Sequence, residues 1–144
     1  MVFFDNYQFI FQLLLAGLLG SLIGLEREYK GKEAGLQTYS LVALGSCLFT
    51  VIAMLLAKSD IVDPSPIFIA IAVGMGFIGA GAIFRGDNTI KGITTAAGLW
   101  VTAAIGMAVG SQFYPLAVYV TFLVLIIFFG LGLLEEKIFK KGKQ

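Results

Sequence analysis

The sequence contains no histidine, a single cysteine and few charged side chains, which make up 13% of its 144 residues. Without histidine it lacks the commonest metal ligand and proton shuttle of proteins. The lone Cys47 excludes an intramolecular disulfide. A soluble domain is about one quarter charged, whereas this chain is 58% hydrophobic and has a mean hydropathy of +0.93. The composition therefore predicts an integral membrane protein.

Other function classes lack their usual sequence signals. The formal net charge of +1 gives no reason to expect a nucleic-acid partner. No nucleophile with a neighbouring base and no cluster of metal ligands is recognisable, so we expect no enzymatic activity. The opening MVFFDNYQF has no Lys or Arg ahead of its apolar run, so we expect no cleavable signal peptide.

Five apolar runs are long enough to cross about 30 Å of hydrocarbon as helices, with some tilt or local thinning. They cover about residues 7–25, 38–57, 67–84, 94–110 and 115–134. We therefore predict an all-α fold, a polytopic bundle of five transmembrane helices in a single domain over residues 1–144. With five crossings, every Lys and Arg except Lys58 falls on one side. The positive-inside rule then places the N-terminus outside and the C-terminus inside.

Small residues recur at helical spacing in two of these runs. In the first run Gly20 and Gly24 are one turn apart, and in the fourth Gly98, Thr102 and Gly106 follow at steps of four. Such stripes allow helices to approach closely in a bilayer. The contact they predict lies either within one subunit or between copies in a homo-oligomer.

The third run contains four glycines in eight residues, Gly74, Gly76, Gly79 and Gly81. The first three spell GxGxxG, but a dinucleotide site needs a preceding strand and an acidic residue about 20 positions on, which this run lacks. The glycines indicate either very close helix packing or a locally loosened helix that lines a cavity. We expect the third and fourth helices to form the packed centre, against the first, with the bulky fifth helix facing lipid.

Charged residues gather where the first and third runs end, on the predicted cytoplasmic side. They are Glu26, Arg27, Glu28, Arg85 and Asp87. Three interpretations fit this candidate ionic cluster: ordinary interfacial charges that reach water, a structural salt-bridge latch, or a site in which Glu26, Glu28 and Asp87 hold a hydrated Mg²⁺. No Asp, Glu, Lys or Arg lies in the middle of a run, which disfavours a self-sufficient ion-coupled pump.

Two segments together resemble the MgtC/SapB family of bacterial inner-membrane proteins. They are LLLAGLLGSLIGLEREYKGKEAGLQTYSLVALGSCLFT and GMGFIGAGAIFRGDNTIKGITTAAGLWVTAAIGMAVG. By matching position, the family's signature residues fall on Glu26, Arg27, Glu28, Gly76, Gly79, Gly81, Arg85, Gly92, Thr94 and Thr95. The sequence departs from longer members of the family by ending at Gln144, so we expect no soluble C-terminal domain here.

The resemblance implies a five-helix domain in the bacterial inner membrane, linked to growth in low magnesium and to virulence. The family has been described both as magnesium transport proteins and as regulators of other membrane complexes, including the ATP synthase. We expect an interaction or regulatory protein whose partners are the lipid bilayer, a second copy of the chain and such a complex. The alternative is a component of a pathway for Mg²⁺ or another small solute. No cofactor is expected apart from Mg²⁺.

Overall fold

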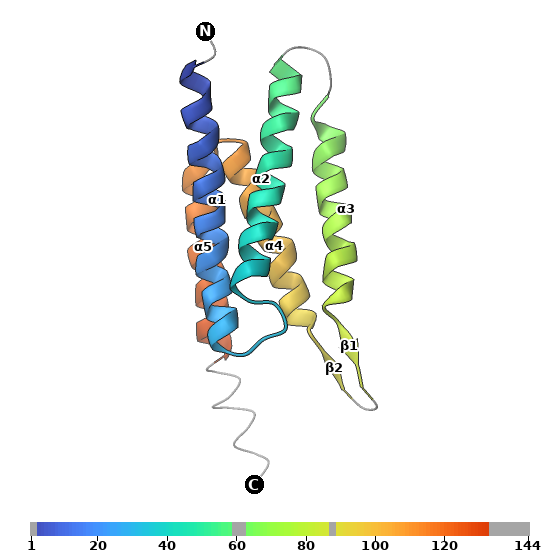
Figure 1. Ribbon diagram of the computed structural model, residues 1–144. Coiled ribbons are helices and arrows are strands. Elements are labelled where there is room, and N and C mark those ends of the chain that lie inside the picture. Colours follow the sequence, from blue (N-terminus) through green and yellow to red (C-terminus); the bar gives the residue numbers. More distant parts are fainter. Residues whose placement is uncertain (1–2, 59–62, 87–88, 133–144) are drawn as a thin grey trace.

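The computed structural model describes residues 3–58, 63–86 and 89–132. The described chain is a bundle of five helices with one short β-hairpin (Figure 1). The helices are α1 (Phe3–Tyr29), α2 (Leu36–Lys58), α3 (Ser65–Gly81), α4 (Ile93–Gly110) and α5 (Tyr114–Ile126), which continues as a π-helical turn, Ile127–Leu131. The predicted helical bundle is confirmed.

All of the helices except α3 are long and apolar enough to cross a membrane. α3 is also apolar, but its 17 residues are at the lower limit for crossing about 30 Å of hydrocarbon. The chain is therefore a multi-pass membrane protein in which each predicted run coincides with one helix. Residues 133 and 134, the end of the fifth predicted run, lie outside the described residues.

α1 and α2 pack along the small residues of α1. A Cβ atom on Gly20 would lie 2.6 Å from the carbonyl oxygen of Tyr39, and one on Gly24 would lie 2.7 Å from Cα of Leu36. Both positions would overlap the backbone of α2, which cannot move aside. These two predicted packing residues therefore lie in a contact within one chain.

α4 is the central helix and contacts α1, α2, α3 and α5. Its glycines face its neighbours, because a Cβ on Gly106 would lie 2.2 Å from the carbonyl oxygen of Ala43 in α2. Thr102 on the same stripe is fully buried, and its hydroxyl donates to the carbonyl oxygen of Gly98 one turn earlier. The small residues of α4 therefore allow it to pack closely against α2, and a larger side chain there would push the two helices apart.

α3 lies at the edge of the bundle, beside α2 and α4 and away from α1 (Figure 1). This corrects the expectation that the third helix belongs to the packed centre against the first. No described atom lies within 4 Å of a Cβ placed on Gly74, Gly76 or Gly81, whereas one on Gly79 would make an ordinary contact of 3.5 Å with Ala96. The predicted close packing is therefore absent within the described chain for three of the four glycines.

A two-stranded antiparallel hairpin joins α3 to α4. Its strands are β1 (Phe84–Arg85) and β2 (Ile90–Lys91), with Phe84 opposite Lys91. The predicted third span reached residue 84, but α3 ends at Gly81 because the chain turns into this hairpin. Gly92 begins α4 with a positive φ of 87°, and a Cβ there would overlap the carbonyl oxygen of Ala82, so only glycine fits this close crossing.

Candidate functional site

A buried ion pair forms at the end of α1, on the side of the bundle where the α1–α2 loop lies. Glu26 and Arg27 are each 3% exposed. Arg27 donates to both carboxylate oxygens of Glu26, through Nε at 2.5 Å and through Nη2 at 2.9 Å. Successive helix residues point in different directions, so the long arginine side chain folds back to make this bidentate pair.

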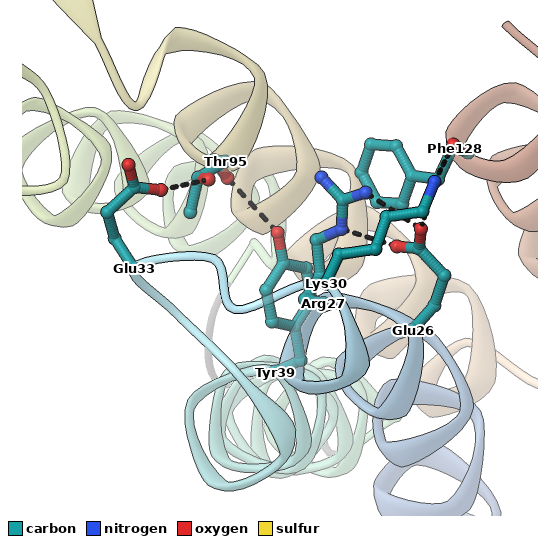
Figure 2. A network of polar contacts seen from close by, with 7 residues as sticks. All are labelled: Glu26, Arg27, Lys30, Glu33, Tyr39, Thr95 and Phe128. Atoms are coloured by element: carbon teal, nitrogen blue, oxygen red, sulfur yellow. Dashed lines mark hydrogen bonds and ion pairs between the residues drawn. The ribbon is translucent and has the colours of Figure 1, made fainter. Parts of the chain in front are cut away.

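Lys30 completes the pair and extends it to α5. Its Nζ lies 3.0 Å from Oε1 of Glu26, one helical turn away. The same Nζ donates to the backbone carbonyl oxygen of Phe128 at 2.9 Å. Phe128 lies in the π-helical turn, where a wider hydrogen-bond register disturbs the regular pairing of carbonyl groups. Lys30 therefore supplies a donor where the last helix departs from α-helical geometry (Figure 2).

The ring of Phe128 lies against the same ion pair. Cζ of Arg27 is 3.8 Å from the centre of this ring, within the range of a cation–π interaction. A Cβ on Gly98 of α4 would lie 2.7 Å from the Phe128 ring, so this glycine makes room for the aromatic side chain. The arrangement ties α1, α4 and α5 together at one end of the bundle.

A second branch of polar contacts connects the α1–α2 loop and α2 to the first turn of α4. The Thr95 hydroxyl donates to Oε2 of Glu33 at 2.9 Å, and the Tyr39 hydroxyl donates to the Thr95 carbonyl oxygen at 3.3 Å (Figure 2). Hydrogen bonds from its own backbone N–H and from the Thr95 hydroxyl hold the pKa of Glu33 below its ordinary value. Tyr39, whose hydroxyl belongs to this branch, is fully buried.

The predicted ionic cluster is only partly assembled. Glu26 and Arg27 come together, but Glu28 is exposed and accepts a hydrogen bond from the Leu36 N–H at 3.1 Å. Arg85 is exposed in β1 and makes no ion pair with Glu26 or Glu28, because the hairpin carries it past the ends of α3 and α4. Asp87 lies outside the described residues. The expectation that all five share one site is therefore wrong for Glu28 and Arg85.

The donor set does not fit the predicted magnesium site. Mg²⁺ is held by free carboxylate oxygens together with water. Both oxygens of Glu26 already accept from Arg27 or Lys30. Over residues 3–58, 63–86 and 89–132, no three His, Cys, Asp or Glu side chains form a group that could hold a metal ion. At Glu26 the ion pairs with Arg27 and Lys30 have the geometry of a salt-bridge latch, one of the three interpretations, and we refer to these three residues as the latch.

Sequence reasoning missed the residues that connect the latch to the other helices. Lys30 follows Glu26 by four positions, a spacing that places side chains on one helix face, so this partner was accessible from the sequence. Phe128 lies 98 positions from Lys30 and Thr95 lies 62 from Glu33. No local pattern indicates such distant contacts.

Comparison with known proteins gives a consistent result. The chain matches the MgtC family over residues 13–137. It is 45% identical over 130 residues to the "Putative magnesium transporter YhiD" of Escherichia coli K12, covering 84% of this chain and 60% of that protein. It is 39% identical over 119 residues to "Protein MgtC" of Salmonella typhimurium LT2, covering 83% of this chain and 50% of that protein. The chain thus spans about half to three fifths of these two relatives. No solved structure matches it.

Proposed function

Because the chain belongs to the MgtC family, we propose that it is a bacterial inner-membrane protein of magnesium homeostasis that acts by binding other membrane proteins through α3. The family predicted from the two quoted segments is confirmed. The proposed action is non-enzymatic and consists of association within the bilayer. One observation carries it, namely the open glycine face of α3.

The face of α3 that points away from α4 has small residues and no partner in the described chain. Ala70, Gly74 and Ile78 follow at steps of four, so they lie on one face of the helix. A Cβ on Gly74 or on Gly81 would meet no described atom within 4 Å, and the side chain of Phe77 beside them is 85% exposed. A helix with small residues on a lipid-facing surface can accept another transmembrane helix at short distance.

A cleft of about 1030 Å³ separates this face of α3 from α2. Its walls include Leu41, Gly45 and Phe49 of α2 and Ala70, Gly74 and Ile78 of α3. These residues are apolar, as expected of a surface that receives a hydrophobic helix. Glycine on both walls would allow the backbone of an incoming helix to approach α2 and α3 together.

The buried charges favour association over conduction. The buried charged side chains of the described spans, Glu26 and Arg27, neutralise each other at one end of the bundle. An ion pathway needs groups at membrane depth that are available to the ion. A latch whose oxygens are already occupied does not offer them.

The test is site-specific photocrosslinking in bacterial membranes. A photoreactive side chain at Phe77 is expected to capture a defined membrane protein, whereas one at Tyr119 of α5, which is 62% exposed, serves as the matched control. Gly74→Leu should abolish the Phe77 adduct and impair growth of a complemented deletion strain at limiting Mg²⁺, without lowering the amount of protein in the membrane. Equal adducts at both positions, or normal growth of the Gly74→Leu strain, would contradict the proposal.

The adduct also identifies the class of partner. A crosslink between two copies of the chain would support the homo-oligomer, and a heterologous adduct would support regulation of another membrane complex, for which the ATP synthase is the candidate implied by the family resemblance. Mass spectrometry of the adduct from residue 77 distinguishes the two cases. Both cases place the contact on α3.

A transport role is the second candidate, favoured by the printed name of the relative from Escherichia coli K12, a putative magnesium transporter. The purified chain in liposomes would then carry a Mg²⁺ flux that Glu26→Gln or Arg85→Ala abolishes. Absence of flux from wild-type protein, together with a Phe77 adduct, would leave the interaction role in place.

A further inference from the structure

A small pocket lies at the end of the bundle opposite the latch. There the first turns of α1, the last turn of α2 and the α4–α5 turn come together (Figure 1). Its volume is about 200 Å³. Its lining includes the polar side chains of Gln12, Lys58, Ser111 and Gln112 and the apolar side chains of Phe9, Val51, Met54 and Leu55. None of these residues belongs to the latch or to the open face of α3.

Gln12 is a buried amide in this pocket with half of its hydrogen-bonding capacity unused. The residue is 1% exposed. Its Nε2 donates to the carbonyl oxygens of Val109 and Gly110 at the end of α4, at 3.0 Å each. These two bonds fix which way the amide points, because two carbonyl oxygens require a donor. Oε1 then has no partner among the described residues, and a buried acceptor without a donor is unfavourable.

Gln112 holds a strained backbone conformation in the same pocket. It is the one described residue other than glycine with a positive φ, 67°. Its N–H donates to the carbonyl oxygen of Val109 and the next N–H donates to that of Ala108, which is the Schellman arrangement that ends many helices. Glycine is the usual residue at this position because it has no Cβ. A glutamine here gives up stability and places a polar side chain in the pocket.

The chemistry of the lining selects a ligand that has groups of both signs. Lys58 presents a cation to the pocket, which favours an anionic group beside it. Oε1 of Gln12 requires an N–H or O–H donor, and the C-terminal end of α4 next to it favours positive charge. A phosphate with a nearby primary ammonium satisfies both requirements. Phe9, Val51 and Met54 offer an apolar wall for an acyl chain.

We propose that this pocket binds the headgroup of a phospholipid that has a primary amine. The phosphate lies at Lys58 and Gln112, the ammonium donates to Gln12, and the acyl chains lie against the apolar wall. The free zwitterion phosphoethanolamine presents the same polar chemistry without the chains. The apolar wall and the position of Lys58 at the end of a membrane-spanning helix favour the lipid over the free zwitterion.

The test compares two lipids that differ in the methylation of the headgroup amine. Phosphatidylethanolamine and phosphatidylcholine have the same phosphate and charge, but the trimethylated amine of the second cannot donate a hydrogen bond. Native mass spectrometry of the full chain in detergent should show phosphatidylethanolamine bound about tenfold tighter, the ratio expected for one charge-assisted hydrogen bond. Equal affinity for the two lipids would overturn the proposal. Free phosphoethanolamine binding as tightly as the lipid would overturn the lipid assignment.

Two variants separate binding from folding. Gln112→Gly relieves the positive φ, so it should raise the melting temperature while weakening phosphatidylethanolamine binding by about tenfold. A merely structural role predicts no loss of binding. Lys58→Gln should weaken both lipids to a similar extent, whereas Lys32→Gln, a matched lysine in the α1–α2 loop, should change neither. Wild-type affinity in both Gln112→Gly and Lys58→Gln would overturn the site.

Discussion

α3 and α4 are adjacent helices of similar character in opposite surroundings. Both are apolar and rich in glycine and alanine, and a short hairpin joins them. Nine of the 18 residues of α4 are buried, whereas the buried residues of α3 are Met75 and Gly79. Glycine content alone therefore does not indicate which helix is central.

The two helices differ in which of their glycines meet a neighbour. In α4, Gly98, Thr102 and Gly106 form one stripe at steps of four, and this stripe faces α2. In α3, Gly74 and Gly79 lie on different faces, and the second of these faces α4. The glycines of α3 that meet no neighbour leave part of this helix open, which is the surface proposed for a partner.

The largest expected effect comes from placing the same large side chain in both helices. Gly106→Leu should destabilise the folded bundle by about 3 kcal/mol or more, because its Cβ would overlap backbone and side-chain atoms of α2. Gly74→Leu should change the free energy of unfolding by less than about 0.5 kcal/mol, as expected for an open site. Equilibrium unfolding in detergent followed by circular dichroism measures both. Equal destabilisation by the two substitutions would remove the distinction between the helices.

Much of the fold was predictable because membrane spans and glycine stripes are local patterns. The five helices follow from apolar length, and the seams of α1 and α4 follow from Gly20, Gly24 and Gly98 at helical spacing. The position of α3 was not predictable in the same way. Its placement depends on the hairpin pairing of Phe84 with Lys91, which ends the helix early and which no apolar pattern reveals.

The candidate site was predictable only where its residues are neighbours in sequence. Glu26 and Arg27 were identified, but the ends of α1 and α3 were expected to share one vestibule, and the hairpin instead separates Arg85 from them. The predicted cluster treated Glu26 and Glu28 alike, whereas Glu26 is buried and Glu28 is exposed. Glu26 is buried together with Arg27, whose long side chain folds back onto the Glu26 carboxylate.

A smaller effect is expected from the hydrogen bond that ties α2 to the start of α4. Tyr39→Phe removes the hydroxyl that donates to the Thr95 carbonyl oxygen and should lower the free energy of unfolding by about 1 kcal/mol. Tyr29→Phe is the matched control, because that side chain is 87% exposed. The same unfolding assay should show no resolvable change for the control. A Tyr39→Phe protein as stable as wild type would show that this bond does not help to hold α4.

The smallest expected effect concerns two carboxylates, one that contacts the first turn of α4 and one that precedes α3. Glu33 accepts from Thr95 across 62 positions, whereas Asp63 accepts from the Ser65 N–H only two positions on, at 3.0 Å. Both pKa values are lowered, Glu33 from 4.5 chiefly by its own backbone N–H and then by Thr95, and Asp63 from 3.8 by the backbone N–H of Ser65.

A lowered pKa in the folded state means that each carboxylate stabilises the protein above its ordinary value and loses that contribution as the pH falls through the folded pKa. Glu33→Gln should therefore lower the melting temperature above pH 4.5 and remove the loss of stability that sets in as the pH falls below 4.5. Asp63→Asn should do the same, with its loss of stability setting in only below pH 3.8. Melting temperatures from pH 7 to pH 3 measure this order. The Glu33 contribution should also decrease in Thr95→Val, because part of it depends on the first turn of α4, whereas the Asp63 contribution should persist there. If Thr95→Val left the Glu33 profile intact, the loop would not be coupled to the central helix.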